Sequence, residues 1–499
     1  MNTNSNAQAG SPILFQHYRD LPAAMFAESK PAPSSTPSLL ELNHAYLDQL
    51  GIDSSWFSSR PGLSVMSGNS INEANHPIAL AYSGHQFGHF SPVLGDGRAH
   101  MLGQVRTVDG QDIDLQLKGS GRTKFSRNGD GRATLGSVIR EYLLSEAMAG
   151  LGISTTRSIA MLATGDSVAR EQLGPGAILV RSAKSHLRVG SFQFAHANLG
   201  KGGVKALADF TIARYFPELE QVPSKYLDLL SVIGKRQATL IADWMLVGFI
   251  HGVMNTDNVS IIGETIDFGP CAFMDEYNPQ KVFSSIDAQS RYAWDQQPTI
   301  GQWNMTRLAE TLLPLFDDDE EKSIEMAQER LSEFIPQFQQ SFQVGLMHKL
   351  GFSEGNDRTR QLTTEMLAAM EQDGVDFTVF FNSLTRAAEG ESVQVVINLF
   401  NDSELSTALI EQWQGLRAKD SDTLLSVTLL KMRQANPAVI ARNHQVQLAI
   451  DAAVGDNDFL PFRRLCRVLA NPYRIDPADH ELMTSPKSEQ RVTQTFCGT

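Results

Sequence analysis

The stretch HGVMNTDNVSIIGETIDFGP, residues 251–270, gathers side chains that suit metal and phosphate chemistry. It holds the amide of Asn258 and, nine positions later, the carboxylate of Asp267 in an Asp-Phe-Gly sequence. Hard divalent cations prefer oxygen ligands of these two kinds. The stretch therefore predicts a divalent-cation site formed by Asn258 and Asp267.

The same spacing occurs in protein kinases, whose catalytic loop reads H-R-D-x-x-x-x-N before a D-F-G. On that template His251 and Asn258 take the places of the histidine and the asparagine, whereas Val253 replaces the catalytic aspartate. Valine can neither orient nor deprotonate an acceptor hydroxyl, so the pattern keeps both metal ligands and lacks the usual base. We interpret His251 as a structural residue that braces the loop.

A hairpin and a helix are predicted upstream to position further polar groups. The tetrapeptide Gly-Asp-Gly-Arg at 95–98 precedes the run AHMLGQVRTV, and Asp-Gly at 109–110 is a turn signal before QDIDLQLK. The alternation in the second run predicts a strand whose polar face ends at Lys118 and points toward a cleft. The segment LGSVIREYLLSEAMAGLG then predicts an amphipathic helix with Glu141 beside its apolar stripe.

These parts come in the order of a protein-kinase chain. Kinases use a lysine–glutamate ion pair to hold nucleotide phosphates, and an asparagine and an aspartate to bind two cations. We therefore expect Lys118 and Glu141 to pair beside the phosphates, with added positive charge from Arg181 and Arg188. No G-x-x-x-x-G-K-[ST] motif occurs, which argues against a P-loop enzyme.

Composition excludes several other classes. The 499 residues are 42% apolar and carry a net charge of −14, which argues against broad binding to nucleic acid or to an anionic membrane and leaves local basic sites open. The longest apolar run, LIADWMLVGFIHGVM, is too short and too polar to cross a bilayer. Only three cysteines occur, without Cys-x-x-Cys spacing, which argues against a structural zinc site. No secretory signal is visible, so we expect a cytoplasmic protein.

The chain divides into four predicted stretches. Residues 1–38 are polar and rich in Pro and Ser, which indicates an extended, partly disordered arm. Residues 39–200 contain many glycines and short alternating runs, which favours a strand-rich lobe that binds nucleotide phosphates. Residues 201–320 form a helical core with the catalytic and metal-binding loops, and residues 321–499 a helical extension with a cysteine tail. The prediction is an α+β, protein-kinase-like bilobal fold.

From about residue 39 to the end, the sequence resembles the selenoprotein O family. The resemblance is carried by YSGHQFGHFSPVLGDGRAHMLGQV, LQLKGSGRTKFSRNGDGRATLGSVIREYLLSEAM, HGVMNTDNVSIIGETIDFGPCAFMDEY and the final CGT. It implies a pseudokinase fold that binds ATP in a reversed orientation, requires Mg²⁺ or Mn²⁺, and transfers AMP to Ser, Thr or Tyr hydroxyls of proteins. We expect redox-related or metabolic proteins among the substrates, and a monomeric enzyme.

The resemblance also implies roles for single residues. Asn258 and Asp267 match the family's metal ligands, Glu141 matches the partner of the phosphate-binding lysine, and Asp257 matches the proposed proton acceptor. A reversed nucleotide brings a different phosphorus beside the metal, so a base at a new position is chemically reasonable. Two alternatives stay open for Asp257, which could be a structural carboxylate or a partner of the metal ligands. The implied nucleotide contacts are Gly95, Gly97, Arg98, Lys118, Asp130, Gly131, Arg181, Arg188 and Asp267.

Two cysteines suggest a redox device. Eukaryotic members carry selenocysteine near the C-terminus, where this chain has Cys497. Cys271 lies two residues after the glycine of the Asp-Phe-Gly sequence. We hypothesise a reversible Cys271–Cys497 disulfide that ties the tail to the active site, because disulfides between exposed, flexible cysteines are labile. In the alternative both stay thiols in a reducing cytosol, or Cys466 takes part in the bridge.

Two further functions stay open. An ordinary kinase that moves the γ-phosphoryl group is disfavoured by Val253. An inactive nucleotide-binding scaffold is disfavoured because the lysine and both metal ligands are kept.

Overall fold

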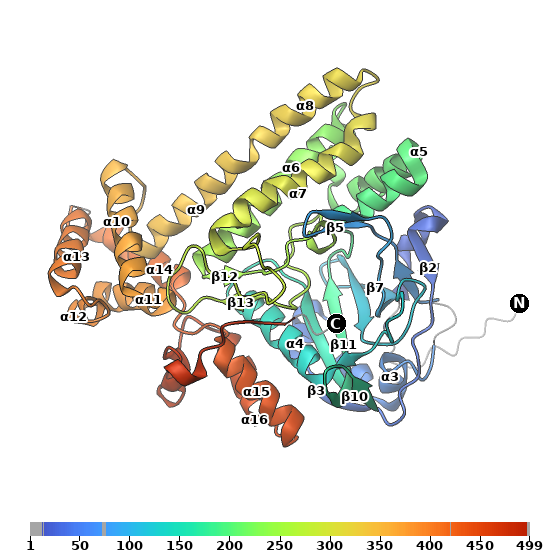
Figure 1. Cartoon of the computed structure of the whole chain (residues 1–499), viewed down its shortest axis with the longest axis horizontal. Helices are drawn as coiled ribbons and strands as arrows, with labels where there is room; N and C mark the ends of the chain where they lie inside the picture. The colour runs from blue at the N-terminus through green and yellow to red at the C-terminus, as the bar shows by residue number, and fades with distance from the viewer. Residues whose placement is uncertain (1–11, 13, 72–75, 420, 497–499) are drawn as a thin grey trace, which may run out of the picture.

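The computed structural model describes residue 12 and residues 14–71, 76–419 and 421–496. A sheet-rich part comes first in the chain, and helices make up most of the remaining chain (Figure 1). This mixed architecture agrees with the predicted α+β class.

A nine-stranded antiparallel sheet forms the first part. Its main order is β2-β4-β7-β8-β11-β10-β3, with β1 beside β7 and β9 beside β11. The predicted hairpin is confirmed, since β7 and β8 pair antiparallel around the turn at residues 109–110. The strands are β1 (Leu14–Phe15), β2 (Phe26–Glu28), β3 (Ser38–Leu42), β4 (Ile78–Leu80), β7 (Ala99–Arg106), β8 (Asp112–Lys118), β9 (Ala133–Thr134), β10 (Arg157–Ala169) and β11 (Leu173–Ala183).

Parts of residues 14–38, which the sequence predicts as a loose arm, belong to this sheet, namely β1, β2 and the first residue of β3. β1 pairs with β7 and β2 pairs with β4, while Tyr18 and Met25 are each only 1% exposed. A few large apolar side chains between the prolines and serines explain the difference, because their burial opposes the entropy of the extended chain.

The two faces of β8 serve different purposes. Ile113, Leu115 and Leu117 pack into a core beneath α1 (His44–Leu50), α2 (Ser54–Ser58) and α3 (Arg60–Met66). The opposite face carries Asp114 and Gln116, which are fully buried. The predicted alternation is thus correct, but the polar face lies inside the protein.

Hydrogen bonds compensate for the burial of that polar face. Asp114 accepts hydrogen bonds from the Tyr18 hydroxyl (2.6 Å) and from Gln104 Nε2 (2.8 Å). Gln116 donates to Asp96 (3.0 Å) and accepts from Arg181 Nε (2.8 Å). A buried polar group without such partners would lower stability by about 1–3 kcal/mol. Because Asp114 and Gln116 have their hydrogen-bond partners, the polar face of β8 can be buried as far as Lys118.

Most of the longer helices come after the sheet in the chain, whereas α4 lies between β9 and β10. Helices α8 and α9 are separated only by Glu333, whose backbone stays in the right-handed helical region. A short hairpin, β5 (Gly84–Gln86) with β6 (His89–Ser91), contacts the catalytic loop, and the strand pair β12 (Phe249–Ile250) and β13 (Ala272–Phe273) encloses that loop in the chain. The longer helices are α4 (Leu135–Gly150), α5 (Val189–Tyr215), α6 (Lys225–Leu246), α7 (Gln297–Leu312), α8 (Glu320–Ser332), α9 (Phe334–Leu350), α10 (Asp357–Asp373), α11 (Phe377–Ala388), α13 (Ser403–Arg417), α14 (Asp422–Ala435), α15 (Asn443–Gly455) and α16 (Leu460–Leu469), with the short α12 (Gln394–Ile397).

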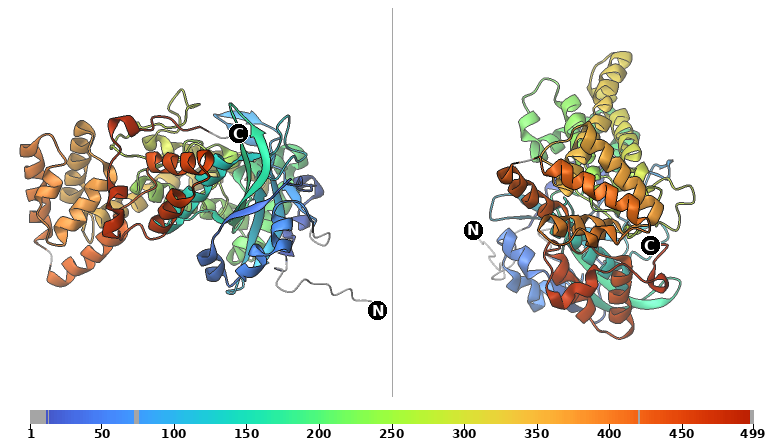
Figure 2. Two further views of the ribbon diagram at one scale, coloured as in Figure 1. Left: turned by 90° about the horizontal axis from the view of Figure 1, so that it is seen from below. Right: turned by 90° about the vertical axis from the view of Figure 1, so that its left-hand side faces the viewer.

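The C-terminal helices return to the sheet-rich part. Helices α10 to α14 lie far from the sheet, whereas α15 and α16 pack beside α4 (Figures 1 and 2). The rings of Tyr142 and Phe462 meet edge to face at 5.4 Å. Within the described part of the chain, no helix combines the length and apolar character needed to cross a membrane.

The close packing of α4 against α16 gives a stability test. A Cβ at Gly150 would lie 1.9 Å from the Leu469 carbonyl oxygen, and this backbone atom cannot swing aside. Gly150→Ala should therefore lower the free energy of unfolding by roughly 1–3 kcal/mol, measured by urea denaturation. Gly202→Ala in α5 is the matched control, because no atom lies within 4 Å of its new Cβ. Equal stabilities of the two variants would contradict the packing.

Candidate active site

A cluster of buried charges lies where β8, β11, α4 and the Asp-Phe-Gly segment meet. Lys118 at the end of β8 forms an ion pair with Glu141 on α4 and lies 3.2 Å from Asp267 Oδ1. Arg181 on β11 holds the other Glu141 oxygen at 3.0 Å. The predicted lysine–glutamate pair is present, and Arg181 and Asp267 join it.

The cations in this cluster lower the pKa values of its two carboxyl groups. Burial by itself would raise the pKa of Asp267, but the cations of Lys118, Arg98 and Arg181 bring it well below its usual value. Burial likewise opposes ionisation of Glu141, yet Lys118 and Arg181 lower its pKa as well. Both carboxylates are therefore anionic at neutral pH.

The backbone at Asp267 is held in an unusual conformation. Its φ of 68° lies in the left-handed region, which non-glycine residues adopt rarely and at a cost. His251, predicted to brace this loop, is fully buried, and its Nε2 lies 3.0 Å from the Ile266 carbonyl oxygen. The histidine therefore holds the residue that precedes Asp267.

The loop that contains Asp257 and Asn258 forms a short 3₁₀ turn, Thr256–Asn258. Asn258 donates through Nδ2 to the Val253 carbonyl (3.1 Å), which fixes the orientation of its side-chain amide. Asp257 is buried, and its Oδ1 also lacks a partner in the described part of the chain. Burial raises the pKa of Asp257 to about 6, against the lowering effect of Arg188.

The β5–β6 hairpin clamps this loop from the side of the sheet. His85 N donates to Thr256 Oγ1 (2.7 Å), and Phe87 N donates to Asn255 Oδ1 (3.0 Å). Gln86 Nε2 donates to Asp257 Oδ2 at 3.3 Å. The hairpin therefore fixes one oxygen of Asp257, while the other has no partner among the described residues.

Arg188 supports the same loop from its other side. Its Nη1 donates to the Asp257 carbonyl oxygen (2.9 Å), and its guanidinium lies over the Tyr82 ring at 4.3 Å. Arg188 Nη2 is buried, has no hydrogen-bond partner in the described chain, and stands 3.9 Å from Asp96. Arg188 Nη2 and Asp257 Oδ1 are thus both buried without a hydrogen bond to the described residues. Such atoms are expected where a site binds a ligand.

Other predicted nucleotide contacts are placed differently. Cβ atoms at Gly95 and Gly97 would lie 2.4 Å and 2.9 Å from atoms of Phe125, so packing against that residue accounts for both glycines. Asp130 forms a two-bond ion pair with Arg170 (2.9 and 3.0 Å) and does not line the active-site cavity. Gly131 accepts a backbone hydrogen bond from Gly121 (2.9 Å). Their contact with nucleotide stays a prediction.

A cavity of about 230 Å³ opens beside the charge cluster. Its lining includes Arg98, Lys118, Glu141 and Asp267, and also Val492, Gln494, Thr495 and Phe496 of the C-terminal tail. Thr495 N donates to the Phe283 carbonyl (2.7 Å), and the Thr495 hydroxyl donates to the carbonyl of Pro270. The C-terminal tail therefore forms part of the wall of the active-site cavity.

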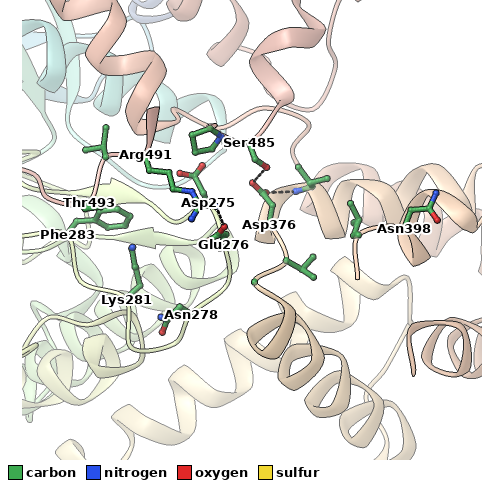
Figure 3. Close-up of a pocket in the computed structure, with 16 residues that line it drawn as sticks. Asp275, Glu276, Asn278, Lys281, Phe283, Asp376, Asn398, Ser485, Arg491 and Thr493 are labelled. Carbon is green, nitrogen blue, oxygen red and sulfur yellow. Dashed lines mark hydrogen bonds and ion pairs between the residues drawn. The ribbon is translucent and has the colours of Figure 1, made fainter. Parts of the chain in front are cut away.

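The tail also closes a second cavity of about 440 Å³ between the segments near residues 275–283 and 374–379 (Figure 3). Arg491 pairs there with Glu276, and Ser485 donates to Asp376 (2.6 Å). These contacts anchor the tail before it reaches the charge cluster.

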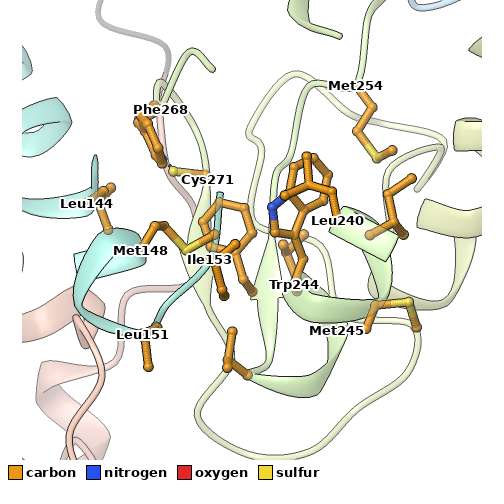
Figure 4. Packing of buried hydrophobic residues seen from close by; sticks show 14 of the residues in the cluster. Leu144, Met148, Leu151, Ile153, Leu240, Trp244, Met245, Met254, Phe268 and Cys271 are labelled. Carbon is orange, nitrogen blue, oxygen red and sulfur yellow. Dashed lines mark hydrogen bonds between the residues drawn. The ribbon is translucent and has the colours of Figure 1, made fainter. Parts of the chain in front are cut away.

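Cys271 is buried, although the redox hypothesis rests on exposed and flexible cysteines. Its side chain lies among Leu144, Met148 and Phe268 (Figure 4), is 0% exposed, and is a free thiol. Burial raises its pKa to about 12, which makes the thiolate scarce at neutral pH. Cys497 lies outside the described residues, so the Cys271–Cys497 bridge stays a prediction.

Comparison with known proteins identifies the family. The family model described as protein adenylyltransferase SelO matches residues 14–470. A protein nucleotidyltransferase YdiU from Shewanella denitrificans is 52% identical over 511 residues, with the whole of both chains covered. The same-named protein of Bacillus cytotoxicus is 47% identical over 482 residues, which span 97% of this chain and 96% of that relative.

The chain belongs to the SelO family of protein adenylyltransferases. It is therefore a nucleotidyltransferase, and the resemblance seen in its sequence is confirmed. Membership in the SelO family agrees with the buried cations beside a cavity, since a nucleoside triphosphate needs several cationic partners.

Sequence reasoning missed two groups in this SelO site. Gln86 and Gly84 contact Asp257, which lies far away in the sequence. The glycines of YSGHQFGHF argue against a helix, and this was the one available signal for a tight hairpin at that point.

The contact between Gly84 and Asp257 gives a test of the hairpin. A Cβ at Gly84 would lie 2.5 Å from Asp257 Oδ1, so the carboxylate must move. Gly84→Ala should lower nucleotidyl transfer by roughly 10²-fold, because small displacements of reacting groups have such effects. Thermal unfolding should stay near that of the wild type. Gly202→Ala is again the control, and wild-type turnover in Gly84→Ala would show that this placement is unimportant.

Proposed function

We propose that this SelO protein transfers AMP from ATP to hydroxyl side chains of protein substrates. The observation that carries the proposal is that two acidic residues, Asp267 and Asp257, have contrasting surroundings. Asp267 sits among cations, whereas Asp257 is buried with an oxygen that has no partner in the described chain. The first suits phosphate and metal binding, and the second suits removal of a proton.

The proposed reaction divides the work between these groups. Lys118 and Arg98 line the cavity and neutralise the triphosphate, while Arg181 adds positive charge from behind Glu141. Arg188 offers its buried Nη2 to a further phosphate oxygen. The acceptor oxygen attacks the α-phosphorus, the bond to the β-phosphate oxygen breaks, and diphosphate leaves. Asp257 takes the hydroxyl proton, a role for which a raised pKa is favourable.

The donor set suits a divalent cation. Asn258 offers an amide oxygen and Asp267 an ionised carboxylate, which are hard ligands of the kind that Mg²⁺ and Mn²⁺ bind. Among the described residues no cluster of three or more His, Cys, Asp or Glu side chains forms a metal site. Phosphate and water oxygens would therefore complete the shell. The bound ion would neutralise charge on the phosphates.

Several related expectations belong to this proposal. They are a protein-kinase-like bilobal arrangement, a reversed ATP, a monomeric cytoplasmic enzyme, and Ser, Thr or Tyr acceptors in redox-related or metabolic proteins. The bond from Thr495 to the Pro270 carbonyl brings the tail beside Cys271 and supports a bridge to Cys497. Because Cys271 is buried, formation of the bridge requires local opening of the core around it.

Labelled ATP tests which phosphorus is transferred. With Mg²⁺ or Mn²⁺ present, label from the α position should enter protein, whereas label from the γ position should not. A chelator added before ATP should stop the transfer. Transfer of the γ label alone would replace this proposal with an ordinary kinase. Metal-dependent ATP binding without any transfer would favour an inactive scaffold.

Substitutions test the division of roles. Asp257→Ala should keep metal-dependent ATP binding and lower turnover by roughly 10²–10⁴-fold, the usual worth of a general base. Asp267→Ala should lose metal-dependent binding and turnover together, because a ligand is removed. Binding is measured by titration calorimetry and turnover by label transfer. Equal losses of binding and turnover in Asp257→Ala would make Asp257 a structural residue.

A further inference from the structure

A basic cavity lies outside the active site. It measures about 490 Å³, and its charged lining consists of Lys184, Arg214, Arg236 and Asp112. None of its lining residues lines the active-site cavity. Three cations against one carboxylate form a local positive surface on a chain whose net charge is −14.

The three cations come from separate elements and keep their charges available. Lys184 comes directly after β11 and is exposed, and Arg236 is exposed on α6, where its guanidinium lies 4.4 Å from the Phe216 ring. The side chain of Arg236 also donates to the Ile262 carbonyl at 3.5 Å, and no ion pair joins it to a carboxylate of the described residues. Arg214, near the end of α5, stands 3.9 Å from Asp112.

The nearby carboxylates do not cancel this charge. Asp112 is held by Arg106 (2.5 and 2.9 Å) and lies 3.1 Å from His17 Nε2. Glu264 is buried and accepts a hydrogen bond from the Lys184 backbone (3.1 Å). Burial raises the pKa of Glu264 to about 8, so it is largely uncharged at neutral pH. Asp109 and Glu218 act on Lys184 and Arg236 only at longer range.

We propose that this cavity binds an acidic segment of the protein substrate, rich in Asp and Glu, at a position separate from the modified hydroxyl. The inference rests on the proposed function, which requires a polypeptide acceptor. An acidic partner is repelled by most of a protein of this net charge, so a local basic surface would orient its approach and select it.

The exposure of the cations favours a flexible acidic chain over a compact phosphate. Lys184 and Arg236 are exposed and Arg214 is half-buried, so no cation among them is enclosed. A small phosphate is usually held by converging donors and backbone N–H groups. Exposed cations spread over several elements suit several carboxylates along an extended chain, each held weakly.

Peptide binding measured without nucleotide tests the cavity directly. The probe is a short fluorescein-labelled peptide of alternating Glu and Ser, and its partner has Gln in place of every Glu. Wild-type protein should bind the Glu peptide with an affinity that falls as salt rises. Lys184→Gln combined with Arg236→Gln should weaken binding roughly tenfold.

The control pair is Lys201→Gln combined with Lys235→Gln, which removes the same charge. Both lysines are exposed, and Lys235 is the neighbour of Arg236 on α6. The control should bind the Glu peptide like the wild type. Equal weakening in both double variants, or equal affinity for the Gln peptide, would overturn the proposal. The proposal would also be overturned if tripolyphosphate bound in a manner that depends on Lys184 and Arg236 while the Glu peptide did not bind.

AMP transfer separates this proposal from the function on which it rests. In the Lys184→Gln, Arg236→Gln protein the KM for the Glu-Ser peptide should rise roughly tenfold at unchanged kcat, while transfer to the Gln-Ser peptide stays the same. A fall in kcat for both peptides would contradict a docking role. Peptide binding that depends on the two cations, with no AMP transfer, would support the docking site and count against the proposed function.

Discussion

The contact between Lys118 and Glu141 is the interaction on which the candidate active site depends. Both side chains are buried, and buried charges cost several kcal/mol each unless they are paired. The pair joins the sheet to α4, while Arg181 and Asp267 complete the charge balance. Removing one member would leave the others uncompensated, so strand, helix and Asp-Phe-Gly segment must assemble together. The polar row along β8 leads to this point and supports it.

Features encoded locally were predictable from the sequence. The hairpin, Lys118 at its end and Glu141 on the next helix are indicated by alternation and periodicity, and their pairing is indicated by the order of the motifs. The features that sequence reasoning missed depend on distant contacts. Gln86 reaches Asp257 only because the fold brings β5 onto the catalytic loop, and Gly95 is a glycine because Phe125 packs against it.

Composition was a poor guide where a few apolar side chains determine the structure of a mostly polar segment. The first segment reads as a loose arm, yet Tyr18 and Met25 fix part of it in the core. The basic cavity could not be predicted from the sequence, because its cations come from segments that are far apart in the chain. The net charge of the whole protein does not show such a local cluster.

The tail contact has a consequence for how the enzyme matures. Val492, Gln494, Thr495 and Phe496 line the active-site cavity, and Thr495 bonds to Pro270, directly after the Asp-Phe-Gly sequence. Ribosomes make proteins from the N-terminus, so the sheet, α4 and the catalytic loop all emerge before this wall exists. The nascent chain therefore passes through a stage with an assembled charge cluster and an unfinished cavity. Synthesis itself delays completion of the site until the rest of the fold is in place.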